Sequence, residues 1–513
     1  MIVHDFMTAP AVVVGGGIAG LSTALALDGC VVVANEPIGG GASCLAQGGI
    51  AAAIADDDSP ALHAADTERV SAGLAVPEIA ALVAGSAPVR IDWLRALGVA
   101  FDQTASGSLA LGREAGHSRN RIIHAGGDRT GAAVMRGLRS AVSRRSDIRV
   151  LEGFALVDLV TCGDRVAGVL LEGLQGMPLA LLAPQVVLAT GGIGACFNHT
   201  TNPSSSRGTG IAAAARRGVL LADLEFVQFH PTALAADADP LPLLTEALRG
   251  AGAVLLDESG DRFMMAIHPD AELAPRDVVA RSVHAIHAAG RQVWLDATGV
   301  ADLEQRFPGA CSLARAAGLD PCRQPLPVTT AAHFHMGGIA TDAQGATSLT
   351  GLWACGEVAS TGLHGGNRLA SNSLLEGLVF GSRIARAIRQ SALAPARGPL
   401  RVSRGPSGSG IDRARISALR QLIGASLGPS RCGSTMQEAA RRLEDWRTTS
   451  RTEHDLITVA RCLLRAALNR RESRGAHQRT DCPQAAAGIA ARSVQLPEPA
   501  PTETLELLRS HVA

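Results

Sequence analysis

The first clear hydrophobic pattern lies near the start of the chain, where residues 11–34 read AVVVGGGIAGLSTALALDGCVVVA. The β-branched run at 12–14 predicts a short buried strand, residues 21–27 predict a helix, and residues 31–33 predict a second strand. A membrane-spanning helix is the alternative for such an apolar stretch, but consecutive glycines and Asp28 would then lie inside it. The pattern therefore favours a buried strand–helix–strand unit.

A glycine motif joins the first strand to the helix. In a G-x-G-x-x-G loop the first glycine permits a tight turn, the second lets the backbone approach a pyrophosphate, and the third lets helix and strand pack closely. Glu36 follows the second strand, about 20 residues after the first glycine, and can accept hydrogen bonds from a ribose. The order of strand, glycine loop, helix, second strand and acidic residue predicts a binding site for a dinucleotide, either FAD or NAD. The alternative is a glycine-rich turn with a purely structural role. The motif residues are Gly15, Gly16, Gly17, Ile18, Ala19 and Gly20.

Two later segments favour FAD over NAD. Residues 42–49, ASCLAQGG, form a second loop of small residues that includes Ser43, Gln47, Gly48 and Gly49. Residues 186–192, VVLATGG, predict another strand that ends at the same crevice. Each segment alone is equally consistent with a tight turn. Together with the first motif they indicate a long cofactor that extends through the domain.

Polar residues then gather in a few segments of an otherwise Ala-rich chain. For each of them a solvated loop or a structural histidine is the alternative to a site. A guanidinium group can donate two parallel hydrogen bonds to a carboxylate. Segments rich in Arg and His therefore predict an anionic substrate. His230-Pro231-Thr232 is expected to end a strand, and Glu357 follows another strand-like run. Pro275 favours the first turn of a helix, so Arg276 is expected near a helix start. The segments are LGREAGHSRNRIIHAGGDRTG (111–131), DLEFVQFHPTAL (223–234), TEALRG (245–250), PRDVVAR (275–281), HFHMGG (333–338) and GEVASTGLHGGNRLASNSLLEGLVFGSR (356–383).

The last of these segments contains a helix start. Residues 371–373, Ser-Asn-Ser, are expected to cap the apolar helix that follows them. The amino-terminal end of that helix would stabilise negative charge on the pyrimidine ring of a reduced flavin. An ordinary capped helix is the alternative.

The carboxy-terminal part has a different pattern. Residues 390–410, rich in Pro, Gly and Ser, predict a linker. Residues 456, 459, 463, 467 and 468 are apolar at helical spacing, which predicts a helical domain followed by extended segments near Pro497 and Pro501. The charged run 470–474, RRESR, is expected to be a solvated face.

Composition narrows the class of protein. With 513 residues, the chain is long enough for about three domains. With 47% hydrophobic and 18% charged residues, it can form large hydrophobic cores. The net charge of +0 argues against a nucleic-acid or membrane-surface binder. The ten cysteines are scattered without a C-x-x-C pair, which argues against metal sites and for a reducing, cytoplasmic location. The start of the chain carries no pattern of a secretory signal.

Taken together, the motifs resemble the L-aspartate oxidase family, within the superfamily of succinate dehydrogenase and fumarate reductase flavoproteins. The resemblance extends from about residue 10 to about residue 485 and is carried by GGGIAG, AQGGIAA, REAGHSRNRIIHAGGD, EFVQFHPTAL, LLTEALRGAGA, APRDVVAR, AAHFHMGG and GLHGGNRLASNSLLEGLVFG. It implies an α/β fold. A Rossmann-like FAD-binding domain (1–223 and 335–404) carries an inserted α+β capping domain (224–334), and a helical domain (405–513) follows.

The resemblance also implies roles for single residues. Arg276 would be the catalytic proton donor or acceptor, and Glu114, an acid typical of aspartate oxidases, would hold the substrate amine. Glu357, Ser373 and Leu374 would contact the flavin, and Ser371 lies in the same loop. Succinate has no ammonium group, so Glu114 best separates an aspartate oxidase from the alternative, a flavoprotein subunit of the succinate dehydrogenase or fumarate reductase type. The substrate would be held by His230, Thr245, Glu246, His333 and Arg368.

Three positions depart from the family pattern. Ala42 stands where membrane-bound members carry a flavin-linked histidine, so the FAD is expected to be non-covalent. Glu36 stands where relatives often carry a basic residue, and Thr209 stands where an Asp is usual. Both differences put individual contacts with the cofactor in question, but not the cofactor itself.

The implied reaction is the oxidation of L-aspartate to iminoaspartate. A hydride would pass from the substrate to flavin N5, and dioxygen or fumarate would then accept the electrons. In the family this product feeds quinolinate formation for NAD biosynthesis, so quinolinate synthase is the expected partner of a monomer or homodimer. A non-catalytic FAD-binding scaffold is a further alternative, which the retained Arg276, His230, His333 and Arg368 oppose.

Overall fold

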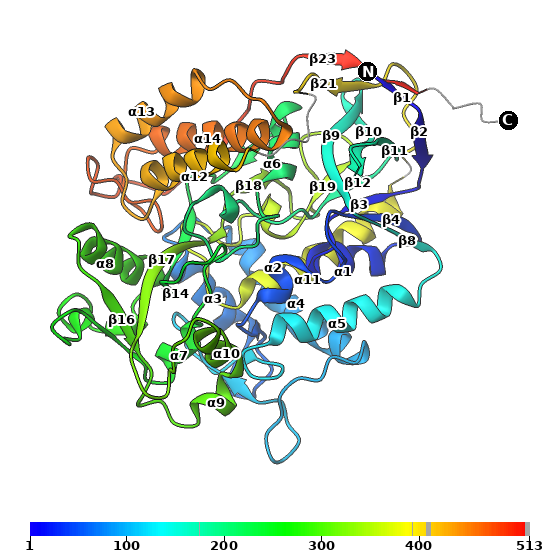
Figure 1. The fold of residues 1–513 in the computed structure, drawn as a ribbon. Helices are drawn as coiled ribbons and strands as arrows, with labels where there is room; N and C mark the ends of the chain where they lie inside the picture. Colours follow the sequence, from blue (N-terminus) through cyan, green and yellow to red (C-terminus); the bar gives the residue numbers. More distant parts are fainter. Residues whose placement is uncertain (174, 392, 407–411, 508–513) are drawn as a thin grey trace.

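The computed structural model describes residues 1–173, 175–391, 393–406 and 412–507. At its centre lies a parallel five-stranded sheet with the strand order β19-β12-β3-β4-β8 (Figure 1). The predicted strand–helix–strand unit is confirmed, as β3, α1 and β4 follow one another. These elements are β3 (Val12–Val14), α1 (Ile18–Ala26), β4 (Cys30–Ala34), β8 (Ile148–Glu152), β12 (Val186–Leu188) and β19 (Leu352–Ala354).

Both faces of this sheet are covered, which explains the uninterrupted apolar runs. Val13 and Val32 face a core formed with α1, α4 (Pro77–Ala96), α5 (Thr130–Ser143) and α11 (Asn372–Gln390). Their neighbours Val12 and Val14 face the opposite core, which includes α6 (Thr209–Arg216). In Figure 1, α1 and α11 lie side by side near the centre of the molecule.

A six-stranded sheet covers one end of the molecule and corrects the linker prediction. Its order is β2-β11-β10-β9-β21-β23, and β21 (Arg401–Ser403) lies inside the stretch that was expected to be a linker. Val402 is fully buried there, so at least this part is an integral strand. The other strands are β2 (Asp5–Thr8), β9 (Phe154–Cys162), β10 (Arg165–Gly173), β11 (Pro178–Leu182) and β23 (Thr502–Thr504).

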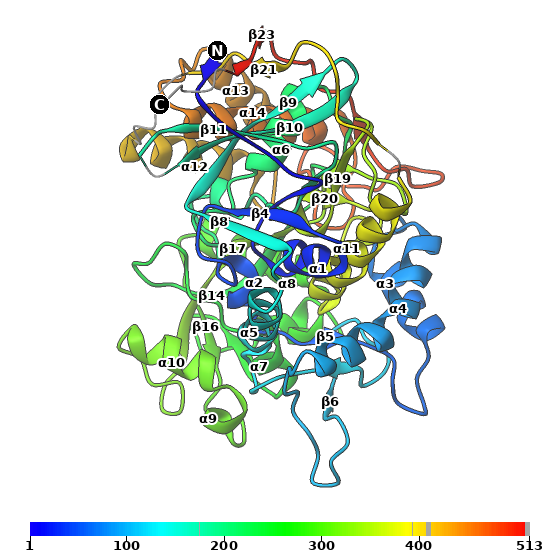
Figure 2. The same cartoon turned by 90° about the vertical axis from the view of Figure 1, so that its right-hand side faces the viewer.

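Residues 234–328 contribute a hydrophobic core of their own, at the lower left of Figures 1 and 2. The prediction that His230-Pro231-Thr232 ends a strand is wrong, because β14 continues to Leu234. The register shifts between His230 and Ala233, so the strand passes Pro231, which has no N–H, with an irregularity. The elements are β14 (Val227–Leu234), α7 (Glu246–Gly250), β15 (Val254–Leu256), α8 (Arg276–Ala288), β16 (Val293–Asp296), α9 (Leu303–Arg306), α10 (Pro308–Ala316) and β17 (Leu326–His335).

The carboxy-terminal part is helical, as predicted, but its tail returns to the first domain. α14 (Arg451–Asn469) buries the predicted apolar face and packs with α12 (Arg413–Leu427) and α13 (Gly433–Glu444). Strands β22 (Val494–Gln495) and β24 (Glu506–Leu507) then pair with β13 (Leu221–Ala222) and β1 (Ile2–Val3).

The expectation of a solvated face at 470–474 is wrong. Arg470 forms ion pairs with the buried Glu225 and with Glu472, at 2.5 and 2.6 Å. Arg474 also pairs with Glu472, at 3.1 Å. The run therefore holds the tail against the rest of the molecule through an ion-pair network.

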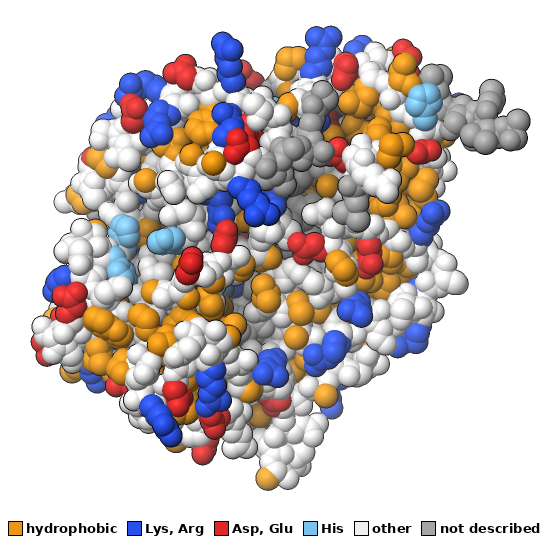
Figure 3. Space-filling model, viewed as in Figure 1, with side chains coloured by type: hydrophobic (Ala, Val, Ile, Leu, Met, Phe, Trp, Pro, Cys, Tyr) orange, Lys and Arg blue, Asp and Glu red, His pale blue; other side chains and the backbone are white. Residues whose placement is uncertain are grey.

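The remaining helices and strands complete the walls around the central crevice. They are α2 (Gly41–Leu45), β5 (Ile50–Ala51), α3 (Pro60–Val70), β6 (Leu111–Gly112), β7 (Ile122–Ile123), β18 (Gly338–Ala340) and β20 (Ala359–Ser360). Acidic and basic side chains are interspersed on the face shown in Figure 3. In the described ranges no helix has both the length and the apolar character that a bilayer crossing needs. The domain boundaries at 223, 334 and 404 stay predictions, and β17 crosses the second of them.

One buried ion-pair cluster joins α6 to the carboxy-terminal helix α14. Arg216 binds Asp455 at 2.5 Å and Asp158 at 3.3 Å, and all three side chains are buried. Arg217 also pairs with Asp158. Breaking such a pair on one side leaves a buried charge uncompensated, which typically costs about 3–5 kcal/mol.

Arg216→Met is therefore expected to lower the free energy of unfolding by about 3–5 kcal/mol, because Asp455 loses its guanidinium partner. Thermal unfolding measures this as a lowered melting temperature. The matched control is Arg441→Met, which removes the exposed pair with Glu438 on α13 and should cost about 0–1 kcal/mol. Equal shifts for the two variants would contradict the importance of the buried cluster.

Candidate active site

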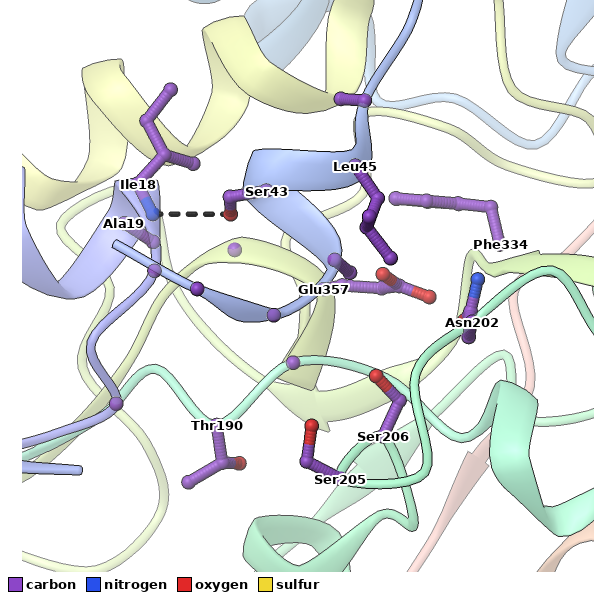
Figure 4. A pocket seen from close by; sticks show the side chains of 18 of the residues that line it. Ile18, Ala19, Ser43, Leu45, Thr190, Asn202, Ser205, Ser206, Phe334 and Glu357 are labelled. Carbon is purple, nitrogen blue, oxygen red and sulfur yellow. Dashed lines mark hydrogen bonds between the residues drawn. The ribbon is translucent and has the colours of Figure 1, made fainter. Parts of the chain in front are cut away.

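A single cavity of about 570 Å³ brings the predicted site residues together. Every predicted cofactor, substrate and catalytic position lines it except Gly20, which lies beneath the glycine turn. Figure 4 shows one part of this cavity, with Ser43, Leu45, Asn202, Phe334 and Glu357 around it. The predicted positions therefore form one continuous site, although they come from segments far apart in the sequence.

The glycine turn is shaped by close approach of the backbone. Gly15 has φ +130°, and a Cβ at this position would lie 2.0 Å from the carbonyl oxygen of Ala189. A Cβ at Gly20 would lie 2.0 Å from the carbonyl oxygen of Gly15. Both observations agree with the roles predicted for the first and third glycines of the motif. The hydroxyl of Ser43 accepts a hydrogen bond from Ile18 N at 3.1 Å, at the start of α1 (Figure 4).

The lining of this end fits FAD. The amino-terminal end of α1 opens into the cavity and offers backbone N–H groups to a pyrophosphate. Thr190 Oγ1 and Gln47 Oε1 are buried and have no protein partner among the described residues, and both side chains line the cavity. Such atoms are expected to hydrogen-bond a polar ligand. Glu36, which follows β4, and Thr209, at the start of α6, line the same end.

Glu357 lines the same cavity. The part of the cavity around Gly15, Glu36 and Thr209 is its cofactor end, and the part around Arg276 and Arg368 is its substrate end. Its Oε1 accepts a hydrogen bond from His335 N at 2.9 Å. Burial raises the pKa of this carboxyl group to about 7, so its protonated form is well populated near neutral pH. A Cβ at Gly192 would lie 2.1 Å from Glu357 Oε1, so the strand-end glycine provides the space for the carboxyl group.

Two arginines dominate the substrate end. Arg276 begins α8 and binds Glu246 through Nε. Its Nη1 donates to Gln228 Oε1 at 3.0 Å, and Arg368 Nε donates to the same oxygen at 3.3 Å. Gln228 Nε2 in turn donates to the carbonyl oxygen of Arg368 at 3.2 Å. Gln228 therefore holds the two guanidinium groups next to each other.

Arg368 is almost completely buried. Burial, followed by the nearby charge of Arg276, lowers the pKa of Arg368 to about 9, which leaves it cationic at neutral pH. Its Nη1 donates to Ser373 Oγ at 2.7 Å, and its guanidinium carbon lies 4.5 Å from the ring centroid of Phe334. These contacts stabilise a guanidinium group that has lost most of its exposure to solvent.

Glu246 balances this positive charge. Burial opposes its ionisation, but Arg276 and Arg249 together lower the pKa of the carboxyl group below its usual value. Arg249 Nη2 lies 3.6 Å from Glu246 Oε2, and the backbone N–H of Ala115 donates to Oε1 at 3.1 Å. Thr245 precedes Glu246 as the amino-terminal cap of α7, with its hydroxyl oxygen 3.4 Å from Ala247 N.

The two histidines of the site are neutral. Burial lowers the pKa of both His230 and His333 far below the usual value, and nearby arginines lower them further. Their rings meet edge to face at a centroid distance of 5.1 Å. Thr232 N donates to His230 Nδ1 at 3.3 Å, so the ring hydrogen of His230 lies on Nε2. His333 Nδ1 lies 2.9 Å from Thr201 Oγ1.

Glu114 reaches the cavity from the loop after β6. Its Oε2 accepts a hydrogen bond from Ser371 Oγ at 2.7 Å. The predicted helix start at residues 371–373 is confirmed, but without the expected side-chain cap. Ser371 is the cap residue, but it has φ +62° and its side chain makes no capping hydrogen bond. The hydroxyl group binds Glu114 instead.

Some site residues were missed by sequence reasoning. Gln228 and Arg249 lie inside segments that were selected for their neighbours, and only their contacts identify them. Thr201 and Asn202 come from a loop without a motif, although Thr201 contacts the His333 ring and Asn202 Nδ2 donates to the His333 carbonyl oxygen at 2.9 Å. Their only available signal was a run of small polar residues after a buried strand.

Comparison with known proteins agrees with this geometry. Residues 11–374 match the family model "FAD binding domain", and residues 434–493 match "Fumarate reductase flavoprotein C-term". The chain is 45% identical to an L-aspartate oxidase of Agrobacterium fabrum over 490 residues, covering 94% of this chain and 93% of the relative. It is also 45% identical to an L-aspartate oxidase of Mesorhizobium japonicum over 492 residues, with coverage of 94% and 93%.

The same fold occurs in solved structures. An E. coli quinol fumarate reductase superposes with a TM-score of 0.87 at 26% identity, covering 99% of this chain and 98% of that one. Two predictions from the sequence are thereby confirmed: the α/β fold with its capping and helical parts, and FAD as the cofactor. The chain belongs to the L-aspartate oxidase family of FAD-dependent oxidoreductases.

Proposed function

We propose that this chain oxidises L-aspartate to iminoaspartate with the residues assembled at the substrate end of the cavity. The observation that carries the proposal is the arginine pair bridged by Gln228, which lies in the same cavity as Glu114 and the cofactor end. Two fixed cations match the two carboxylates of the substrate. Glu246 already pairs with Arg276, so Glu114 is the acid left to match the ammonium group. When bound, FAD supplies the two-electron acceptor of the reaction.

The two carboxylates of the substrate bind at different parts of the site. Arg368 and Arg276 each offer guanidinium N–H groups to a carboxylate. The neutral His230 presents its Nε2–H, and with Thr245 and His333 it supplies uncharged hydrogen-bonding groups. Burial of these groups strengthens each polar contact and excludes water from the reacting carbon.

The proton leaves through Arg276 and Glu246. When Cα gives up its hydrogen with two electrons, the substrate ammonium must lose one proton to form the iminium. The proton can instead leave from Cβ, which gives an enamine that tautomerises to the same product. An arginine normally stays protonated, so Arg276 can act only by passing a proton to a partner as it accepts another. Its Nε contact with Glu246 supplies that partner, and Arg249 stabilises the carboxylate.

The capping elements close the site over the substrate. Gln47, on the FAD side, donates from Nε2 to the carbonyl oxygen of Leu243 at 2.8 Å, and Leu243 precedes α7. Arg276 and Glu246 both belong to residues 234–328, in α8 and α7, whereas Arg368 and Glu114 belong to the FAD side. The two halves of the machinery therefore act together only when the layers meet.

The wider setting is proposed from the family. Dioxygen or fumarate takes the electrons in the second half of the reaction, and iminoaspartate then feeds quinolinate formation, with quinolinate synthase as partner. All ten cysteines are free thiols, which supports a cytoplasmic location for this monomer or homodimer.

The alternative is a flavoprotein subunit of the succinate dehydrogenase or fumarate reductase type. The fold likeness to quinol fumarate reductase favours it, but Glu114 opposes it, because succinate and fumarate offer no ammonium group to that carboxylate.

We expect the FAD to be released by acid precipitation, because Ala42 offers only a methyl group where some relatives carry a flavin-linked histidine. The measurement is the absorbance at flavin wavelengths of the supernatant and of the washed, redissolved pellet. Flavin that stays with the denatured chain would contradict a non-covalent site.

Arg276→Lys and Arg276→Leu are expected to lower kcat for aspartate by about 10²–10⁴-fold, the usual contribution of a general acid or base. FAD content should not change, because Arg276 belongs to α8 and not to a cofactor loop. Steady-state kinetics and flavin absorbance of the purified variants measure both quantities. A variant with most of its kcat would remove Arg276 from the proton path.

Glu114→Gln is expected to lower kcat/KM for aspartate far more than for fumarate reduction. An ammonium group in a dry pocket without an anionic partner costs several kcal/mol, roughly a 10²-fold loss or more. Both activities are measured on one preparation, so the shared arginine and histidine contacts act as an internal control. Equal losses would mean that Glu114 only supports the pocket.

A further inference from the structure

The segment after Glu114 contains more buried polar chemistry than the proposed function uses. Arg121 is fully buried and binds Asp58 through two hydrogen bonds of 2.8 and 2.9 Å. It also binds Asp66 at 2.6 Å. With both carboxylates satisfied, Arg121 still directs one further N–H toward His117. A cation surrounded in this way can orient a neighbouring group firmly.

His117 is held in one tautomer. Arg121 Nη1 donates to His117 Nδ1 at 3.2 Å, so the ring hydrogen must lie on Nε2. His117 Nε2 then donates to the carbonyl oxygen of Ala370 at 3.0 Å. Burial lowers the pKa of His117 to about 4, so the ring is neutral and this arrangement persists at physiological pH.

A second histidine holds the other side of the same turn. His63 Nε2 lies 2.8 Å from Asn372 Oδ1, and Asn372 Nδ2 donates to Thr67 Oγ1 at 3.0 Å. Burial also lowers the pKa of His63 to about 4. The carbonyl oxygen of Ser371, between these two contacts, accepts a hydrogen bond from Ala51 N at 3.1 Å. Residues 370, 371 and 372 are therefore each anchored separately.

These anchors explain the conformation of Ser371. Its φ of +62° lies in the left-handed region, which costs a non-glycine residue roughly 1–2 kcal/mol. In this conformation the hydroxyl group of Ser371 points to Glu114 Oε2, 2.7 Å away, and not to the helix it precedes. Both side chains line the cavity, next to Gly48.

We propose that Ser371 is a positioning residue that orients the Glu114 carboxylate toward the substrate amine, and that His117 and His63 hold Ser371 in the conformation this requires. The preference for an amine-bearing dicarboxylate would then depend on the turn as well as on the acid. This inference rests on the proposed role of Glu114. It assigns a use to the buried polar residues of 111–131 that the proposed function leaves out.

The test is a double-mutant cycle between Ser371→Ala and Glu114→Gln. Ser371→Ala alone should lower kcat/KM for aspartate by roughly 10–100-fold, the usual effect of losing a hydrogen bond to a charged group. Fumarate reduction should fall at least about tenfold less than aspartate oxidation, because fumarate has no amine. Both rates are expressed per bound FAD, so that any loss of cofactor from this loop affects them equally. In the Glu114→Gln background, Ser371→Ala should have almost no further effect on aspartate.

Two outcomes would overturn the inference, and they are distinguishable. If the two losses multiply independently, Ser371 does not act through Glu114, while the role of Glu114 stands. If Glu114→Gln does not affect aspartate selectively, the proposed function of Glu114 fails and the positioning role fails with it.

The histidine anchor has its own test. His117→Leu removes the donor to the Ala370 carbonyl oxygen and should reproduce the selective aspartate loss of Ser371→Ala. His117→Gln keeps an amide N–H and should restore most of the activity. If His117→Gln loses aspartate and fumarate activity equally, the role of His117 is purely structural and the proposal for it is wrong.

Discussion

The site depends on one electrostatic constraint, which is to keep Arg276 and Arg368 side by side where little of either side chain is exposed to solvent. Two adjacent buried cations repel each other and lose their hydration. The chain compensates with Glu246 against Arg276, Phe334 and Ser373 against Arg368, and a shared acceptor on Gln228. Burial keeps His230 and His333 neutral by lowering the pKa of both rings, and the positive field of the arginines lowers it further.

This constraint explains why the chain is folded in layers. Arg368 follows the central sheet on the FAD side, whereas Arg276 and Glu246 belong to elements that pack around a separate core. The cavity is lined from both sides, and this brings the two arginines together on Gln228. The tail strands pair with β13 and β1 and so join the end of the chain to the FAD-binding part.

Charge and conformation are combined at Glu114. The carboxylate is directed by a serine whose backbone is held in an unfavourable conformation, and the energy for this comes from hydrogen bonds around Arg121, His117 and His63. In the proposed mechanism, selectivity for the amine therefore depends on residues that do not contact the substrate. The left-handed backbone of Ser371 is a local cost in stability, which the surrounding hydrogen bonds offset.

The sequence by itself determined the elements whose signal is local. The glycine turn at 15–20, the buried valine strands and the amphipathic helix α14 follow from spacing and residue type, and the family motifs named the site residues. Three predictions from the sequence were corrected: a strand that ends at Thr232, a side-chain cap at residues 371–373, and a solvent-exposed run at 470–474. Each of these depends on a partner far away in the chain: β17 beside β14, Glu114 beside Ser371, and Glu225 beside Arg470. Only the tertiary structure decided them, and only it revealed Gln228 between the arginines, because a hydrogen bond between distant segments leaves no periodic trace in the sequence.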